Sequence, residues 1–235
     1  LAHSLLVGPA GPGGGVDAPA MADQVRRLRP RLVAVTHVPT NSGLVQDVAV
    51  IGASCRELGI PFLVDGCQSV GQMPVDVEEL GCDFLSGTGR RFLRGPRGTG
   101  FLFVSDRMLD AGWEPLLPDM RAADWIEADL YQPSPDATRY ENWEFNYAAV
   151  LGLGAAVDEA LARGVPIVEN VVASLAGSLR AKLADAGFET YDLGERRCAI
   201  VTTAVPGLDS TVVKERLAEQ GINVSVTTPG STLLD

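Results

Sequence analysis

Two stretches of the sequence carry the side chains best suited to chemistry. The first is Val64-Asp65-Gly66-Cys67-Gln68-Ser69, which completes the apolar run Pro61-Phe62-Leu63. A short apolar run bounded by turn residues predicts a buried strand. Asp65 then stands at the carboxyl end of that strand, where open α/β sheets bind their ligands. We therefore expect the Asp65 carboxylate to face a bound molecule.

The second stretch is Ser86-Gly87-Thr88-Gly89-Arg90-Arg91, which follows the short apolar pair Phe84-Leu85. It leads through Gly95-Pro96-Arg97-Gly98-Thr99-Gly100 into a further apolar run over 101–104. The pattern predicts strand, loop and strand. Hydroxyls, guanidinium groups and backbone amides on one loop suit an oxyanion or a phosphate.

The composition excludes several kinds of protein. The chain has 235 residues, 46% hydrophobic and 21% charged, with a net charge of −11, and this length suits one large domain or a domain and a half. The acidic balance argues against a nucleic-acid partner, which usually needs a basic surface. No apolar run approaches the roughly 20 residues of a membrane helix. Four scattered cysteines and two histidines give no metal-ligand spacing, so we expect no metal and reduced, cytoplasmic thiols.

The elements that position the two stretches follow a strand–helix–strand rhythm. Apolar strands are expected at 32–35 and 61–64, with a helix over 48–58 that Gly59 ends. Short, fully apolar strands alternating with helices indicate a parallel sheet in an α/β protein. The remaining expectations are a strand at 5–7, helices over 17–28, 147–163, 167–186 and 211–220, an irregular segment over 108–140, and strands at 198–203 and 222–226. We expect Ser210 to cap the helix over 211–220.

The two stretches together resemble the class V aminotransferase family, whose members have the fold-type I architecture and use pyridoxal phosphate. The resemblance implies an α/β three-layer sandwich with a mostly parallel central sheet, plus part of a smaller α/β C-terminal domain. It divides the chain into a large cofactor-binding domain (1–146, with an N-terminal part missing), a connecting helix (147–170) and a truncated small domain (171–235). It also implies a homodimer.

The resemblance implies roles for several residues in and near the two stretches. Asp65 matches the aspartate that pairs with the pyridine nitrogen, and Gln68 matches the glutamine that bonds the ring hydroxyl. Asn41, which follows the strand at 32–35, matches a polar residue near that hydroxyl and the substrate. The phosphate-side loop is matched by Ser86, Thr88 and Arg90.

Arg91 stands where the family carries the lysine that forms a Schiff base with the cofactor. A guanidinium group stays protonated and its nitrogens are delocalised, so it cannot form an imine and is a poor proton shuttle. The only lysines, Lys182 and Lys214, are expected on surface helices far along the chain. We therefore expect pyridoxal phosphate without covalent attachment.

Two further residues are candidates for the substrate. Arg139 matches an arginine that precedes the long helix, although the family's glycine-threonine-proline that follows is replaced by Trp143-Glu144-Phe145-Asn146. His37 follows the strand at 32–35, and either a cofactor- or substrate-facing role or a place at the edge of the core would suit it.

The resemblance implies carbanion chemistry on an amino acid, either β-elimination at a C–S bond or epimerisation, with a sulfur-containing substrate for the former. A persulfide mechanism is not expected, because the loop over 227–231 has no cysteine and Cys198 lies in an expected strand. One alternative is an impaired or non-enzymatic relative that binds the cofactor non-covalently. Another is a plain α/β domain in which Asp65 and Arg91 form an ion pair.

Overall fold

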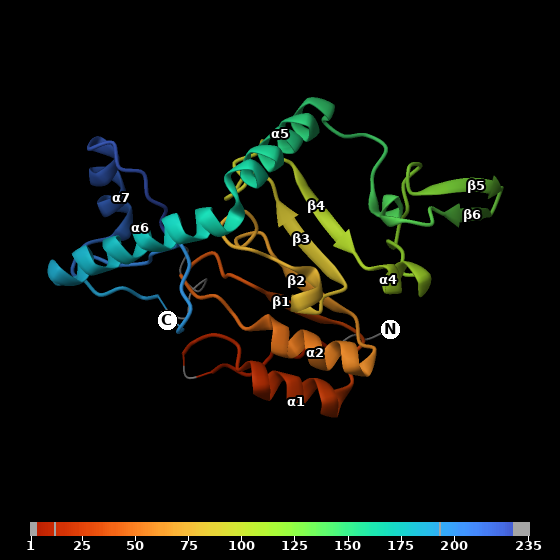
Figure 1. The fold of residues 1–235 in the computed structure, drawn as a ribbon, viewed down its shortest axis with the longest axis horizontal. Coiled ribbons are helices and arrows are strands. Elements are labelled where there is room, and N and C mark those ends of the chain that lie inside the picture. The colour runs from red at the N-terminus through yellow and green to blue at the C-terminus, as the bar shows by residue number, and fades with distance from the viewer. Residues whose placement is uncertain (1–3, 12, 193, 228–235) are drawn as a thin grey trace.

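A computed structural model describes residues 4–11, 13–192 and 194–227 (Figure 1). Its helices are α1 (Ala18–Leu28), α2 (Val48–Leu58), α3 (Val77–Leu80), α4 (Asp106–Asp110), the 3₁₀ helix η1 (Ala137–Tyr140), α5 (Tyr147–Arg163), α6 (Val165–Asp185) and α7 (Ser210–Glu219). Its strands are β1 (Val33–Thr36), β2 (Phe62–Asp65), β3 (Phe84–Thr88), β4 (Gly100–Val104), β5 (Ala123–Glu127) and β6 (Leu130–Pro133).

The main sheet has the order β1-β2-β3-β4. The β1–β2 and β2–β3 pairs are parallel and the β3–β4 pair is antiparallel, so the predicted α/β class with a mostly parallel sheet is confirmed. The register places Thr36 beside Asp65 and Asp65 beside Ser86. Three consecutive strands therefore deliver polar side chains to the same edge of the sheet.

Helices α1 and α2 pack together on one face of the sheet (Figure 1). The core between these helices and the sheet is formed by buried apolar side chains, namely Ala18, Val25, Val33, Val35, Val48, Ile51, Cys55, Phe62, Val64 and Leu85. Asp17 caps α1 by accepting a hydrogen bond from the Ala20 amide at 2.9 Å. Gly59 ends α2 in the left-handed conformation that the sequence predicted.

Gly52 allows α2 to approach the end of α3 closely. A Cβ atom at this position would lie 1.9 Å from the carbonyl oxygen of Leu80. A side chain cannot be placed there without moving backbone. The absence of a side chain at residue 52 thus sets how closely the helix before β2 and the turn before β3 can pack.

Helix α5 packs against the β3–β4 end of the sheet (Figure 1). Between them lies a cavity of about 670 Å³, lined almost wholly by apolar side chains, including those of Leu85, Phe101, Phe103, Val157, Ala160, Leu161 and Val165. Helix α6 follows directly, because Gly164 is both the C-cap of α5 and the N-cap of α6. Its φ of +80° is one that glycine adopts readily.

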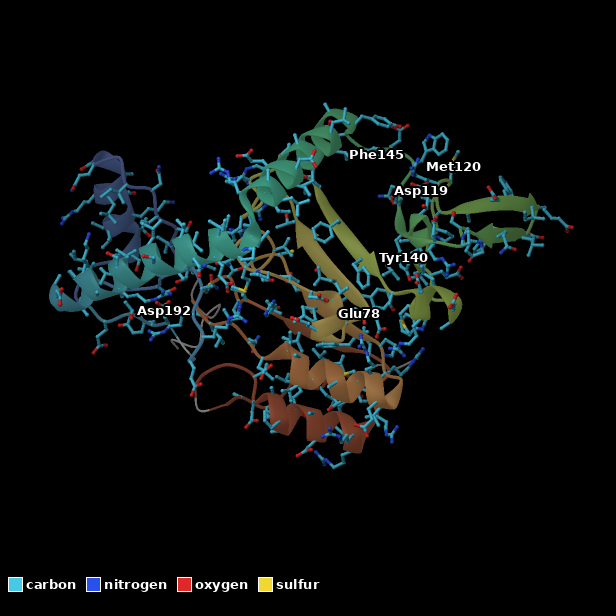
Figure 2. The ribbon with its side chains drawn as sticks, in the orientation of Figure 1. Glu78, Asp119, Met120, Tyr140, Phe145 and Asp192 are labelled. Atoms are coloured by element: carbon cyan, nitrogen blue, oxygen red, sulfur yellow. The ribbon has the colours of Figure 1, made fainter. Side chains whose placement is uncertain are left out.

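The segment over 108–140, expected to be irregular, contains the antiparallel hairpin β5–β6, which extends away from the sheet (Figure 1). The segment is joined to the sheet by aromatic packing, with the Phe84 ring 6.0 Å from Trp113 and 6.3 Å from Tyr140. Figure 2 shows Tyr140 between β4 and this hairpin. The expectation of an irregular loop was therefore wrong over its centre.

Three strand predictions were also wrong. Residues 5–7 form no strand, and their side chains are exposed, Leu5 by 92%. No β-strand forms over residues 198–203 or over residues 222–226, both of which the structure describes. In the former segment, the amides of Ala199 and Thr202 donate to the side chains of Gln72 and Asp192 instead of to a neighbouring strand. The helix over 211–220 is present, but its cap is Asp209, not Ser210.

Candidate functional site

The edge of the sheet where β1, β2 and β3 end carries the first part of the candidate site. Asp65 closes β2, and its Oδ1 accepts a hydrogen bond from the Cys67 amide at 2.9 Å. The amide of Gly66, the residue between Asp65 and Cys67, donates to the carbonyl oxygen of Ser86 at 2.9 Å. These bonds turn the chain sharply after β2 and hold the Asp65 carboxylate beside β3.

Cys67 belongs to this cluster, although the sequence did not single it out. Among the four cysteines it is the one that is not buried. Burial and the neighbouring Asp65 raise the pKa of its thiol, while Ser86 and Arg91 act in the opposite direction. Its position two residues after the strand-end aspartate is the signal that could have identified it.

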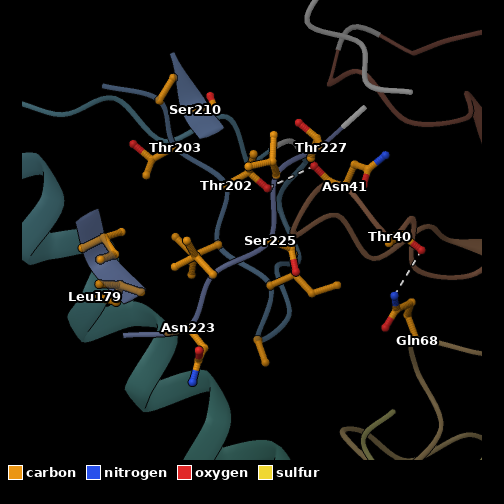
Figure 3. Close-up of a pocket in the computed structure, with 18 of the residues that line it drawn as sticks. Thr40, Asn41, Gln68, Leu179, Thr202, Thr203, Ser210, Asn223, Ser225 and Thr227 are labelled. Carbon is orange, nitrogen blue, oxygen red and sulfur yellow. Dashed lines mark hydrogen bonds between the residues drawn. The ribbon is translucent and has the colours of Figure 1, made fainter. Parts of the chain in front are cut away.

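Gln68 connects the strand end to the opposite side of a pocket. It is 5% exposed, and its Nε2 donates to Oγ1 of Thr40 at 3.1 Å (Figure 3). Its carbonyl oxygen accepts a hydrogen bond from Gln72, whose own Oε1 accepts one from the Ala199 amide at 3.1 Å. A continuous hydrogen-bonded path therefore runs from the loop after β1 to the chain segment after residue 198.

The pocket has a volume of about 960 Å³. One wall comes from the strand-end loops and is formed by Thr40, Asn41, Gln68, Arg91 and Phe92. The other wall comes from α6, α7 and the segments 199–205 and 223–227. Figure 3 shows polar side chains from both walls, including those of Thr202, Asn223 and Ser225, around the space between them. Three predicted site residues, Asn41, Gln68 and Arg91, thus share one cavity.

Arg91 gives this pocket its charge. Among the described residues that line the pocket, Arg91 is the only one with an ionisable side chain. The side chain is half-buried, and within the described part of the chain no hydrogen bond or ion pair holds its guanidinium group. In particular, no ion pair joins it to Asp65, so the plain α/β domain held by an Asp65–Arg91 pair receives no support.

The remaining predicted cofactor residues lie near the pocket but outside its lining. Ser86 and Thr88, expected on a loop, are part of β3, and the Thr88 hydroxyl donates to the carbonyl oxygen of Thr99 at 3.5 Å. The strand is longer than predicted because β4 pairs with it through residue 88. Arg90 is exposed in the turn that follows.

His37 and Arg139 are placed differently. His37 is 4% exposed, its buried Nδ1 has no hydrogen-bond partner among the described residues, and burial together with Arg196 lowers its pKa to about 4. Arg139 is also buried, and its guanidinium group donates to the carbonyl oxygens of Ser134, Leu109 and Trp113 at 2.8 to 3.2 Å. Neither residue lines the pocket. The interactions of Arg139 stabilise the segment around the hairpin, so we do not include it in the proposed substrate site.

A buried ion pair supports the contact between the two walls of the pocket. Arg180 of α6 donates from Nε to Oδ2 of Asp192 at 2.6 Å, and the Asp192 side chain is fully buried beside α6 (Figure 2). Oδ1 of Asp192 accepts from the amides of Gly43 and Thr202, both at 3.2 Å. The Thr202 hydroxyl in turn donates to the carbonyl oxygen of Asn41 at 3.0 Å (Figure 3). The loop carrying Asn41 is thereby attached to the opposite wall.

Comparison with known proteins identifies the family. The family model described as aminotransferase class-V matches residues 7–233. The chain belongs to the class V aminotransferase family. A probable cysteine desulfurase of Methanothermobacter thermautotrophicus is 32% identical over 208 residues, which is 88% of this chain and 52% of that protein. A probable hercynylcysteine sulfoxide lyase of Mycobacterium tuberculosis is 31% identical over 193 residues, 81% of this chain and 46% of that protein.

A solved structure extends the likeness to the fold. The apo cysteine desulfurase of Thermococcus onnurineus NA1 superposes with a TM-score of 0.82 at 26% identity, covering 90% of this chain and 52% of that one. The fold-type I architecture is therefore confirmed. The chain spans about half the length of the curated relatives it matches.

Class V aminotransferases use pyridoxal phosphate, and the donor set of this chain fits that cofactor in part. A carboxylate stands at the strand end, as a protonated ring nitrogen requires, and the amides of Gln68 and Asn41 line the adjacent pocket. No lysine is among the described residues that line the pocket, and the basic side chain there is that of Arg91. The residues present thus fit a cofactor held without a covalent bond.

Within the described residues, no helix is long and apolar enough to cross a membrane. Those same residues contain no group of three or more His, Cys, Asp or Glu that could hold a metal ion.

Proposed function

We propose that this chain binds pyridoxal phosphate non-covalently at the edge where β1, β2 and β3 end. The observation that carries the proposal is the placement of Asp65 beside Ser86 next to a pocket lined by Gln68 and Asn41. Asp65 would pair with the ring nitrogen, and the two amides would bond the ring hydroxyl. Ser86, Thr88 and Arg90 would provide the phosphate side.

The parent activity in this proposal is cleavage of a C–S bond in a sulfur-containing amino acid, with epimerisation as the alternative. When bound, the cofactor supplies an electron sink for a carbanion at the amino acid's α-carbon. The carboxylate of Asp65 keeps the ring nitrogen protonated, which that electron sink requires. The relatives named as a cysteine desulfurase and a hercynylcysteine sulfoxide lyase support a sulfur-containing substrate.

A persulfide mechanism remains disfavoured by the residues of this chain. Cys198 is buried among Val38, Val45 and Met73, and burial raises the pKa of its thiol. A buried, protonated thiol is a poor nucleophile. Residues 228–231, where the sequence also has no cysteine, lie outside the described part of the chain.

Arg91 favours a second candidate function, that of a binding protein with little or no catalytic activity. A proton on the α-carbon of the substrate must be moved by a base that is neutral part of the time. The guanidinium group of Arg91 remains protonated and cannot serve. In this candidate the chain keeps the cofactor pocket, and Arg91 orients ligands without transferring protons.

The assembly around this site is also a proposal. We place the cofactor in a large domain over 1–146, joined through 147–170 to a small domain over 171–235, within a cytoplasmic homodimer. In the proposed connecting segment, α5 runs from Tyr147 to Arg163, and α6 begins at Val165 and continues to Asp185.

The test is to add pyridoxal phosphate to the full chain and to an Arg91→Lys variant, and to record the absorption of the imine. The proposal expects the visible imine band, fixed by borohydride, in the variant alone. Arg94→Lys is the matched control, because Arg94 is exposed on the same turn and does not line the pocket. A band in the unmodified protein would show that another amine serves. No band in any of the proteins, together with no binding by equilibrium dialysis, would refute the cofactor site.

A further inference from the structure

The guanidinium group of Arg91 is a charge without a partner in a pocket that is otherwise neutral. The other described lining residues carry hydroxyl, amide or apolar side chains. Arg180 of α6, by contrast, is neutralised by Asp192. Arg91 has no such partner within the described residues. The pocket therefore has a net positive charge that an anionic ligand can neutralise.

A guanidinium group is particularly suited to one kind of anion. Its planar array of N–H donors matches a carboxylate or phosphate in a bidentate pair, and such charge-assisted hydrogen bonds are about twice as strong as neutral ones. Partial burial strengthens the attraction further, because water screens it less. A half-buried, unpaired arginine in a pocket is accordingly a binding group and not only a lost lysine.

We propose that Arg91 binds the carboxylate of an amino acid that is already joined to pyridoxal phosphate. This inference rests on the proposed function, since it requires Asp65 and Gln68 to hold the ring. The joining needs no amine from the protein: in solution the cofactor's aldehyde and the amino acid's amine condense to an imine and release one water. The chain would thus take up the amino-acid conjugate in preference to the free cofactor.

The experiment uses two stable analogues that differ only in the carboxylate. They are N-(5′-phosphopyridoxyl)-L-alanine and N-(5′-phosphopyridoxyl)ethylamine, secondary amines that cannot exchange with a protein amine. Their dissociation constants are measured by isothermal titration calorimetry on the full chain, on Arg91→Gln and on Arg94→Gln. A ratio of two constants on one protein does not depend on the fraction of protein that is correctly folded.

The unmodified protein is expected to bind the alanine conjugate about tenfold or more tightly than the ethylamine conjugate, the range of a charge-assisted hydrogen bond. In Arg91→Gln the ratio should fall to about one, and Arg94→Gln should keep the original ratio. A ratio near one in the unmodified protein, with both analogues bound, overturns the role of Arg91 and leaves the cofactor site standing. Equal weakening of both analogues by Arg91→Gln assigns the guanidinium to the phosphate and overturns the proposal. Binding of neither analogue overturns the proposed function itself.

Discussion

Replacing Asp192 by asparagine tests whether the buried ion pair holds the two walls of the pocket together. The Asp192 carboxylate is fully buried and accepts three hydrogen bonds, from the Arg180 guanidinium and from the amides of Gly43 and Thr202. Asparagine keeps one oxygen, which can still accept from the two amides. Its NH₂ group, however, would face the Arg180 donor, so the charged bond is lost and Arg180 stays buried without a counter-ion.

The expected cost follows from that geometry. Removing one partner of a buried ion pair typically costs about 3–5 kcal/mol, because the remaining charge is left desolvated. Arg180 keeps its two hydrogen bonds, to the carbonyl oxygens of Cys198 and Ile200, which places the Asp192→Asn variant near the lower end, about 3 kcal/mol. Arg180→Met should cost as much or more, since the Asp192 side chain has no exposure at all.

The assay is urea unfolding of the single variants and the double variant, read as a double-mutant cycle. The double variant should be less destabilised than the sum of the singles by about 1.5 kcal/mol or more. The matched control is Glu159→Gln, which removes the Arg163–Glu159 ion pair on α5. That pair has the same N–O distance of 2.6 Å, but both of its side chains are more than half exposed. Glu159→Gln should therefore lower the free energy of unfolding by less than about 0.5 kcal/mol. A cost below 1 kcal/mol for Asp192→Asn would refute the reasoning.

Three further predictions concern other parts of the chain. Gly52→Ala should lower the free energy of unfolding, measured by urea unfolding, by more than about 3 kcal/mol, because its Cβ would meet the Leu80 carbonyl oxygen. The control is Gly177→Ala in α6, where the space is open; this variant should be neutral or slightly stabilising in the same assay. The pKa of His37 is about 4 in the folded chain against 6.5 in the unfolded chain, so the unfolded state binds the extra proton first as the pH falls. The free energy of unfolding should therefore fall by about 2–3 kcal/mol as the pH drops from 6.5 towards 4. Equal shifts of the urea midpoint for His37→Asn and for the unmodified protein across this range would contradict that origin. Native protein should release one equivalent in a thiol titration with 5,5′-dithiobis(2-nitrobenzoate) and Cys67→Ser none, because the other three cysteines are buried; more than one equivalent from folded protein would count against this burial.

The sequence predicted the elements of the main sheet and its helix α2 well where local signals and packing agree. Helix α2 begins and ends at the predicted residues, because its apolar face and the left-handed Gly59 act over the same short range. Strand β2 was predicted to within one residue for the same reason, and it ends at Asp65, while Gln68 lines the pocket. Each of these predictions depended only on residues close in sequence.

Other features of the structure could not be read from local patterns, either because they depend on partners far along the chain or because a turn lacks its usual signal. Residues 198–203 have the composition of a strand, but their amides are used by Gln72 and Asp192, which no local pattern reveals. Arg139 has the residue type for a substrate carboxylate, yet carbonyl groups up to 30 residues away occupy it. Hairpin β5–β6 was missed because its two-residue connection, Ala128-Asp129, has no glycine to signal a turn.

The junction at Gly164 has a mechanical consequence for both cavities. Helix α5 lines the apolar cavity against β3 and β4, and α6 lines the larger pocket that contains Arg91. Because a single residue joins the two helices, no loop between them can absorb a change in direction. Any tilt of α6 that widens or narrows the pocket must either move α5 against the sheet or be taken up entirely by the backbone angles of Gly164.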